Sequence, residues 1–214
     1  FLLFQIEILR KAGIKDITLS LSYQPNKIED VLGDGSDLDV SLSYVTEPSP
    51  MGTAGAYRFA AGDKKETTIV FNGDILTDVD IAAIVEQHKS RKAEATITLT
   101  PVPDPSAYGL VKTGDDGKVL EFLEKPDRGQ LEKISVNTIN AGIYVLEPSI
   151  LELIPKNENR SFEYHVFHEI LEKQMLFYSY ILGKEYWRDI GTPENYLAAH
   201  IDFLNGRIKG FDPP

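Results

Sequence analysis

The sequence predicts an α/β domain built on a mixed, mainly parallel sheet that is flanked by helices. Segments with helical and strand periodicity alternate through the first half of the chain, and the second half is richer in strands. The 214 residues are enough for one domain with a sizeable core. Apolar residues make up 42% of the chain and charged residues 26%, which is typical of a soluble globular protein.

The alternation is clearest over the first hundred residues. Leu2, Ile6 and Leu9 recur at helical spacing, and Gly13 suits the end of that helix. Asn26 is expected to cap a short helix, and Asp80 stands near the start of a longer one. In chain order we predict helices over 1–12, 27–32, 53–61 and 81–88, and strands over 16–21, 40–45, 67–71 and 95–100.

Strand patterns dominate the middle of the second half, and helices follow them. Asp115-Asp116-Gly117 is a hairpin turn signal between two of the strands. Thr192 suits the N-cap of the last helix, and Pro193 suits its first position. We predict strands over 108–112, 119–123 and 139–146, and helices over 149–154, 162–173 and 193–205.

Charge and composition exclude several classes of protein. The formal net charge of −11 argues against a nucleic-acid groove, which needs a basic surface. An acidic protein that binds polyphosphate usually needs a divalent cation between the two. The chain has no cysteine, so disulfides and thiolate metal sites are impossible. No apolar run is long enough to span a membrane. We therefore expect a cytoplasmic protein without nucleic-acid or membrane partners.

Two carboxylates stand where ligands bind in α/β sheets. Asp74 follows a short apolar strand, in Asn72-Gly73-Asp74, and Asp189 follows an extended run and precedes a helix. Ligands of open α/β sheets bind at the carboxyl ends of strands, and Mg²⁺ is commonly held there by one or two carboxylates and substrate phosphates. The alternative is that both aspartates only cap local turns, and for Asp74 taken alone this alternative is slightly favoured.

Two further segments have the composition of ligand-binding loops. The run from Glu47 to Ala56 is rich in small residues, which let a backbone approach a flat ligand, and amides at a helix start can meet an anion. For the glycines taken alone, a plain turn with a tightly packed helix is the favoured explanation. In the run from Glu121 to Pro126, Lys125 can hold a phosphate and a carboxylate can accept bonds from sugar hydroxyls. A solvated strand edge is the simpler interpretation of that run.

The order of these motifs resembles the sugar-1-phosphate nucleotidyltransferases, and most closely the mannose-1-phosphate guanylyltransferases among them. The resemblance covers almost the whole chain. It implies a Rossmann-like nucleotide-diphospho-sugar transferase fold over residues 1–214, with a nucleoside triphosphate and a sugar 1-phosphate as substrates and Mg²⁺ as the cofactor. The motifs that carry it are Glu-Pro-x-Pro-Met-Gly-Thr-Ala-Gly-Ala, Phe-Asn-Gly-Asp, Tyr-Gly-Leu-Val, Phe-Leu-Glu-Lys-Pro, Asn-Ala-Gly-Ile-Tyr and Trp-Arg-Asp-Ile-Gly-Thr-Pro.

The resemblance also implies roles for individual residues. Asp74 and Asp189 match the metal-binding aspartates, and Lys125 matches the lysine that holds the phosphate of the sugar. No role is assigned to Glu163, because the residues that follow it depart from the family pattern. Positions around the sugar are matched by Tyr108, Gly109, Glu124 and Asn140, and the base-binding segment by Glu47, Pro50, Gly52 and Thr53.

Glu47 bears on the choice of base. An ionised carboxylate only accepts hydrogen bonds, and guanine offers two adjacent donors, whereas uracil and thymine offer one donor between two acceptors. The expected reaction is therefore GTP plus mannose 1-phosphate giving GDP-mannose. A thymidylyl- or uridylyltransferase of glucose 1-phosphate and a non-catalytic subunit that binds nucleotide sugars remain open, as does assembly into a homo-oligomer.

The resemblance further implies that family members begin with a strand and a glycine-rich loop that cradles the triphosphate. Neither is found in this chain, so we expect the domain to lack its N-terminal segment. A nucleotide-sugar-dependent glycosyltransferase is a rival enzyme class, since Asp78-Val79-Asp80 has the form of its Asp-x-Asp motif. Capping of the following helix explains those aspartates more simply.

Overall fold

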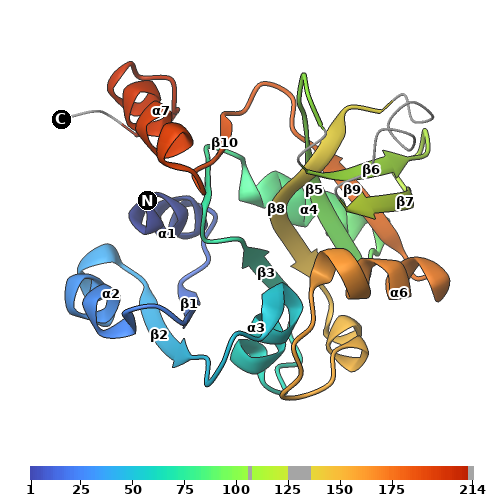
Figure 1. Cartoon of the computed structure of the whole chain (residues 1–214), viewed down its shortest axis with the longest axis horizontal. Coiled ribbons are helices and arrows are strands. Elements are labelled where there is room, and N and C mark those ends of the chain that lie inside the picture. The colour runs from blue at the N-terminus through green and yellow to red at the C-terminus, as the bar shows by residue number, and fades with distance from the viewer. Residues whose placement is uncertain (106–107, 125–135, 212–214) are drawn as a thin grey trace.

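The computed structural model describes residues 1–105, 108–124 and 136–211, and its centre is a sheet flanked by helices (Figure 1). The strand order is β7-β6-β8-β5-β9, and β3 also pairs with β8. The sheet therefore joins elements from both halves of the chain. Its strands are β3 (Thr68–Phe71), β5 (Ala95–Pro101), β6 (Gly109–Thr113), β7 (Val119–Glu124), β8 (Thr138–Leu146) and β9 (Phe177–Ile181).

The predicted α/β class and mixed sheet are confirmed, but the expectation that the pairing is mainly parallel is wrong for the described strands. β5 pairs with β9 in parallel, whereas β8 is antiparallel to β3, β5 and β6. β3, β5 and β9 consequently run in one direction, and β8 runs against them. The β–α alternation of the first half gives the common direction. The long strand β8, from the second half, then lies beside β5 on one edge and beside β3 and β6 on the other.

Most predicted helices are present and end within a few residues of their expected limits. Asp80 caps α4 by accepting a hydrogen bond from the Ala83 amide, and Thr192 caps α7 in the same way. The α-helices are α1 (Leu2–Lys11), α2 (Pro25–Leu32), α3 (Gly52–Ala61), α4 (Ile81–Arg91), α6 (Phe167–Glu172) and α7 (Pro193–Leu204).

Three local predictions are corrected. The residue before α2 is Gln24 with a φ of 48°, and Pro25 is the first helical residue, so Asn26 lies inside the helix and does not cap it. The segment Pro148–Leu153 (η2) is a 3₁₀ helix. The helix predicted over 162–173 begins as a π-helical turn over Phe162–Val166 (η3) and continues as α6.

Two short strands that no periodicity revealed lie side by side. β4 (Ile75–Thr77) follows the Asn72-Gly73-Asp74 motif, and β10 (Trp187–Asp189) contains the second aspartate. They pair antiparallel with Asp189 opposite Ile75. Strands of three residues are too short to show an alternation of their own, and they exist because they pair with each other.

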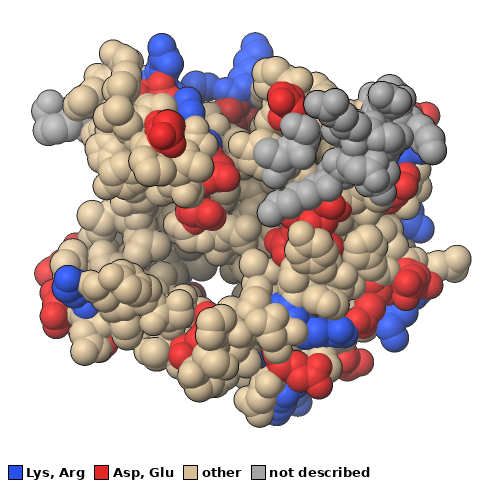
Figure 2. Space-filling view, viewed as in Figure 1, with Lys and Arg blue, Asp and Glu red and all other residues tan. Residues whose placement is uncertain are grey.

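The strands β1 (Asp16–Leu21) and β2 (Ser41–Thr46) form a separate parallel pair. In the described part of the chain, β1 is paired along one edge by β2, and β3 is paired along one edge by β8. Figure 2 shows an opening through the molecule between the parts that carry β1 and β3 in Figure 1. An unpaired strand edge presents backbone N–H and C=O groups with which a further strand can pair. An additional N-terminal strand at this place stays a prediction.

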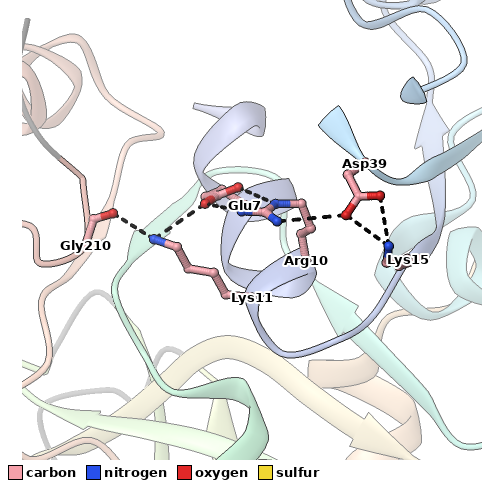
Figure 3. A network of polar contacts seen from close by, with 6 residues as sticks. All are labelled: Glu7, Arg10, Lys11, Lys15, Asp39 and Gly210. Atoms are coloured by element: carbon pink, nitrogen blue, oxygen red, sulfur yellow. Dashed lines mark hydrogen bonds and ion pairs between the residues drawn. The ribbon is translucent and has the colours of Figure 1, made fainter. Parts of the chain in front are cut away.

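Polar contacts on the outer side of α1 connect it to both neighbouring segments. Lys11 Nζ donates to the carbonyl of Gly210 at 2.8 Å, beyond α7, and Lys15 Nζ contacts both oxygens of Asp39 at 2.9 Å. These contacts are solvent-exposed, so each adds little to the stability. Their role is to orient α1, whose buried side faces the candidate site. Figure 3 shows the network of Glu7, Arg10, Lys11, Lys15, Asp39 and Gly210.

None of the helices in the described ranges is long and apolar enough to cross a membrane.

Candidate active site

The two aspartates singled out in the sequence meet in the structure. Asp74 directly precedes β4 and Asp189 ends β10, so the pairing of these strands brings them to the same place. The amide of Ile190 donates to the carbonyl of Asp74 at 2.8 Å and closes the pair at this end. A Cβ added to Gly191 would lie 2.9 Å from Asp189 Oδ1 and 3.5 Å from Asp74 Oδ2. Both carboxylates therefore border one small space that only a glycine leaves open.

Electrostatics at this pair favour a cation. Partial burial and the negative charge of Asp189 raise the pKa of Asp74 above its ordinary value. No group of three or more Asp, Glu, His or Cys side chains that could hold a metal occurs among the described residues. Two carboxylates suit Mg²⁺ that arrives with substrate phosphates, because such ions are usually held by one or two carboxylates plus phosphate oxygens. The donor set of Asp74 and Asp189 thus fits Mg²⁺, and binding of the ion by them stays a prediction.

Asp78 and Asp80, the residues of the rival Asp-x-Asp motif, have structural partners instead. Asp78 accepts hydrogen bonds from the amides of Tyr186 at 2.7 Å and Lys209 at 2.8 Å, and Asp80 caps α4. Both carboxylates therefore already accept hydrogen bonds from backbone amides. This arrangement supports the capping interpretation over the glycosyltransferase one.

Residues predicted around the sugar gather beside the aspartate pair. Gly109 lies opposite Glu124 in the β6–β7 pairing, and a Cβ on Gly109 would lie 2.6 Å from Glu124 Oε2. The ring of Tyr108 packs edge-on against that of Trp187, with the ring centroids 6.1 Å apart. Burial and the charge of Asp189 raise the pKa of the Tyr108 hydroxyl. The structure thus brings Tyr108, Gly109 and Glu124 close to β10. Lys125, the predicted phosphate ligand, lies outside the described residues.

Asn140 belongs to the same region through β8. Its Nδ2 donates to the hydroxyl of Tyr144 at 2.9 Å, and its Oδ1 accepts from the amide of Gly142 at 3.0 Å. Trp187 Nε1 donates to the carbonyl of Ala141 at 2.9 Å, which ties β8 to β10. The strand with Asn140 is therefore fixed relative to the strand with Asp189. A contact of Asn140 with a sugar stays a prediction.

The predicted base-binding segment leads from β2 into α3. Glu47 accepts hydrogen bonds from the amide of Met51 at 3.1 Å and the hydroxyl of Ser20 at 3.4 Å. A carboxylate has about four lone-pair sites, so both oxygens keep capacity for a further donor. The carbonyl of Pro50 accepts from Asn159 Nδ2 at 2.8 Å. The loop is thus held in one conformation by its surroundings.

The start of α3 is packed against the chain segment around Arg160. The amides of Ala54 and Gly55 both donate to the Arg160 carbonyl at 3.0 Å, so the expectation that amides of this helix start meet an anion is wrong for these two. Gly52 has a φ of +71°, and a Cβ there would lie 2.5 Å from the same carbonyl. Close packing thus explains this glycine. A contact of Gly52 with a base stays a prediction.

Glu163 connects the base side of the site to the sugar side. Its carboxylate accepts hydrogen bonds from Thr53 Oγ1 at 2.8 Å, from Ser161 Oγ, and from the Tyr144 hydroxyl at 3.4 Å. Burial and the charge of Glu163 raise the pKa of Tyr144 far above its ordinary value, so this hydroxyl stays a donor. Glu163 lies on the π-helical turn η3, a conformation that is frequent at functional sites. In the sequence, Ser161-Phe162-Glu163 has the Ser-x-Glu form that often starts a helix in the family which the chain resembles, and this is the signal that pointed to Glu163.

Gln5 holds the Asp74 loop from behind, and sequence analysis did not predict this role. Its Nε2 donates to the carbonyls of Asn72 at 3.0 Å and Ile75 at 2.8 Å, on either side of Asp74, and the side chain is buried. The only sign in the sequence is a polar residue on the apolar face of the first helix. These two hydrogen bonds hold the backbone of the Asp74 loop on both sides of the aspartate.

Replacing Gln5 by Leu is expected to destabilise the protein by about 1–3 kcal/mol, because the Ile75 carbonyl loses a buried donor and the Asn72 carbonyl keeps only the Ile75 amide. Denaturant unfolding measures this effect, and hydrogen exchange of residues 72–75 shows where it acts. Gln87→Leu is the matched control, since Gln87 Nε2 also donates to a backbone carbonyl, that of Ser179, away from the aspartate pair. Equal exchange at 72–75 in both variants would contradict the role of Gln5.

Comparisons with known proteins agree with this geometry. The family model described as nucleotidyl transferase matches residues 1–206. A mannose-1-phosphate guanylyltransferase of Mycobacterium tuberculosis is 38% identical over 96% of this chain and 56% of its own length. The mannose-1-phosphate guanylyltransferase catalytic subunit beta of Drosophila pseudoobscura pseudoobscura is 35% identical over 95% of this chain and 54% of its own. The chain thus spans little more than half the length of these relatives.

Solved structures with the same fold include HddC from Yersinia pseudotuberculosis. It superposes with a TM-score of 0.77 at 30% identity, over 95% of this chain and 85% of its own. A structure of the same protein complexed with GMP-PN has a TM-score of 0.75 at 29% identity, over 94% of this chain and 85% of its own. A putative glucose-1-phosphate thymidylyltransferase from Bacillus anthracis, at 21% identity and a TM-score of 0.81 over 99% and 83%, shows that the fold is shared.

Proposed function

The chain belongs to the nucleotidyl transferase family, and from that premise we propose that it forms GDP-mannose from GTP and mannose 1-phosphate with release of pyrophosphate. The observation that carries the proposal is the pairing of Asp74 with Asp189 beside Tyr108, Gly109 and Glu124. This pairing brings two carboxylates, which suit a cation, next to the residues predicted to hold the sugar. The relatives that are named mannose-1-phosphate guanylyltransferases support this pair of substrates.

In the proposed reaction, a phosphate oxygen of the sugar 1-phosphate attacks the α-phosphorus of the nucleotide, and pyrophosphate leaves. No covalent intermediate with the protein is needed, so the residues of the chain act by positioning and by charge. Asp74 and Asp189 would hold Mg²⁺, which would supply positive charge to neutralise the phosphates. Lys125 is proposed to hold the sugar phosphate, and Glu124 to accept hydrogen bonds from sugar hydroxyls.

The full-length protein is the form in which this activity is proposed. A preceding strand and glycine-rich loop would supply backbone amides for the triphosphate, and the open edges of β1 and β3 leave room for such a strand. A cytoplasmic location belongs to the same proposal, because both substrates are soluble phosphates. Pyrophosphate release from GTP and mannose 1-phosphate tests the function directly, and binding of GDP-mannose without turnover would identify a regulatory subunit instead.

Nucleotide choice gives a sharper test. The full-length protein is expected to use GTP at least about tenfold better than UTP or dTTP in kcat/KM, because Glu47 accepts two donors from guanine. Glu47→Gln is expected to lower kcat/KM for GTP by about 10–100-fold, the size of one lost hydrogen bond to a charged group. Glu29→Gln, on the exposed face of α2, serves as the control. A wild-type rate with dTTP that equals the rate with GTP rejects guanine selectivity.

A further inference from the structure

A buried carboxylate lies behind the candidate site, on α7. Asp202 is 3% exposed. Its Oδ2 accepts hydrogen bonds from the Tyr186 hydroxyl at 2.9 Å and from Arg188 Nη2 at 2.8 Å, and its Oδ1 accepts from Arg207 Nη1 at 2.6 Å. Burial alone would raise the pKa of Asp202, but these hydrogen bonds and charges hold it below its ordinary value. Asp202 is therefore an ionised group with several donors, outside the predicted site.

One of its partners stands next to a predicted metal ligand in the sequence. Arg188 lies between Trp187 and Asp189 on β10, and successive side chains of a strand point to opposite faces. The Arg188 guanidinium accordingly faces α7, where Asp202 and the Tyr186 hydroxyl contact its Nε at 3.2 and 2.9 Å. Arg188 nevertheless remains near the site, since its charge lowers the pKa of Tyr108 while that of Asp189 raises it.

If the contacts between Arg188 and Asp202 were lost, the Arg188 guanidinium would bind a carboxylate of the site more favourably than water. The guanidinium and the aspartate pair belong to one neighbourhood, because the charges of Arg188 and Asp189 both act on the hydroxyl of Tyr108. Arginine forms bidentate pairs with carboxylates, and Asp74 and Asp189 are two like charges at close range. Arg188 paired with them would occupy the oxygens that a divalent cation needs.

We propose that Asp202 is a positioning residue that holds Arg188 on the α7 side of β10 and so keeps Asp74 and Asp189 available to a divalent cation. The proposal rests on the proposed function, which places the cation at this pair. It assigns α7 a role in the site although α7 contributes none of the predicted ligands.

Mn²⁺ binding to the full-length protein without substrates, followed by electron paramagnetic resonance, tests this role apart from turnover. Asp202→Asn is expected to weaken Mn²⁺ binding about tenfold, the effect of bringing an opposite charge to within ~4–6 Å of a carboxylate. Adding Arg188→Met to Asp202→Asn is expected to restore the affinity to within about twofold of the wild type, because the competing guanidinium is gone.

The matched control is the double variant Asp202→Asn with Arg207→Met. It has the same net charge as the first double variant and removes the other arginine that contacts Asp202. Because Arg188 is still released, its Mn²⁺ affinity is expected to stay low. Equal recovery in both double variants, or recovery in neither, overturns the proposal, because then net charge or folding explains the effect.

Two further measurements keep the outcome clear. If Asp202→Asn does not fold, Tyr186→Phe replaces it, because it removes one of the contacts to Arg188. This variant is expected to weaken Mn²⁺ binding by a smaller factor, and Arg188→Met is expected to reverse that loss as well. Asp74→Asn separates the two levels of the proposal. Mn²⁺ binding by the wild type that does not depend on Asp74 removes the proposed cation site itself, whereas binding that depends on Asp74 but not on Asp202 overturns only the role of Asp202.

Discussion

Replacing Asp74 by Asn is expected to lower the turnover of the full-length protein by about a hundredfold to a thousandfold, and at the same time to stabilise the protein when no divalent cation is present. The loss of turnover follows from the loss of a ligand charge for the cation that neutralises the phosphates, and one such preorganised electrostatic contact is worth ~10²–10³ in rate. The gain in stability follows from the surroundings of Asp74 in the folded chain.

Burial and the charge of Asp189 raise the pKa of Asp74 in the folded state. The folded protein thus holds this proton at pH values where the unfolded chain, with an ordinary aspartate pKa of ~3.9, has lost it. Stability therefore falls as the pH rises from the unfolded pKa through the folded one, and the cost persists at neutral pH. Asn carries no charge, so its advantage over Asp is absent at low pH and present in full above the folded pKa.

Thermal unfolding with chelator and with excess Mg²⁺ measures this difference. The variant is expected to melt above the wild type in chelator, and Mg²⁺ is expected to raise the melting temperature of the wild type only. Asp78→Asn is the control with the opposite sign, because its carboxylate accepts two backbone hydrogen bonds and its loss should destabilise the protein. An Asp74→Asn variant that melts below the wild type in chelator would contradict the repulsion between Asp74 and Asp189.

Sequence periodicity predicted the long elements of this fold and missed the short ones that build the site. α1 and α4 each present several apolar positions at helical spacing, and β8 is long enough to show its pattern. β4 and β10 have three residues each, and only their mutual pairing makes them strands. The direction of β8 within the sheet depends on contacts between distant segments, so local patterns carry no information about it.

The motifs singled out the two aspartates that the structure brings together, but the contacts of the surrounding residues required the structure. Asp74 and Asp189 were paired by resemblance, and the antiparallel pairing of β4 with β10 gives the physical reason. Gln5 and Asp202 are buried polar residues that act through hydrogen bonds to backbone or to a distant arginine. A polar residue on an apolar helix face gives no indication of its partner, so roles of this kind are visible only in three dimensions.

The contacts of Gly55 are likewise visible only in the structure. They predict that Gly55→Ala lowers the stability, whereas helix propensity alone predicts that it raises it. Gly55 lies inside α3, where Gly→Ala ordinarily stabilises a helix by ~0.5–1 kcal/mol. A Cβ at this position would lie 2.5 Å from the carbonyl oxygen of Glu158 and 3.3 Å from the amide nitrogen of Arg160. Both neighbours are backbone atoms and cannot move as a flexible side chain does.

Gly55→Ala is therefore expected to destabilise the protein by about 1–3 kcal/mol, the usual cost of forcing extra atoms into a packed interior. The shift would separate α3 from the segment around Arg160, whose carbonyl accepts from the amides of Ala54 and Gly55, and would disturb Thr53 beside Glu163. We expect the KM for GTP to rise about tenfold or more while the affinity for Mn²⁺ stays within twofold, because the aspartate pair lies on other strands.

Denaturant unfolding and steady-state kinetics on the full-length protein measure both effects. Gly183→Ala is the matched control, because the nearest atom to its added Cβ is a side-chain oxygen of Glu185 at an ordinary 3.6 Å, and its stability is expected to change by less than ~0.5 kcal/mol. A Gly55→Ala protein that is as stable as the wild type would show that the segment around Arg160 yields to α3. The predicted base-binding segment would then be adaptable, and the fixed loop geometry on which the proposed selectivity of Glu47 for guanine depends would be lost.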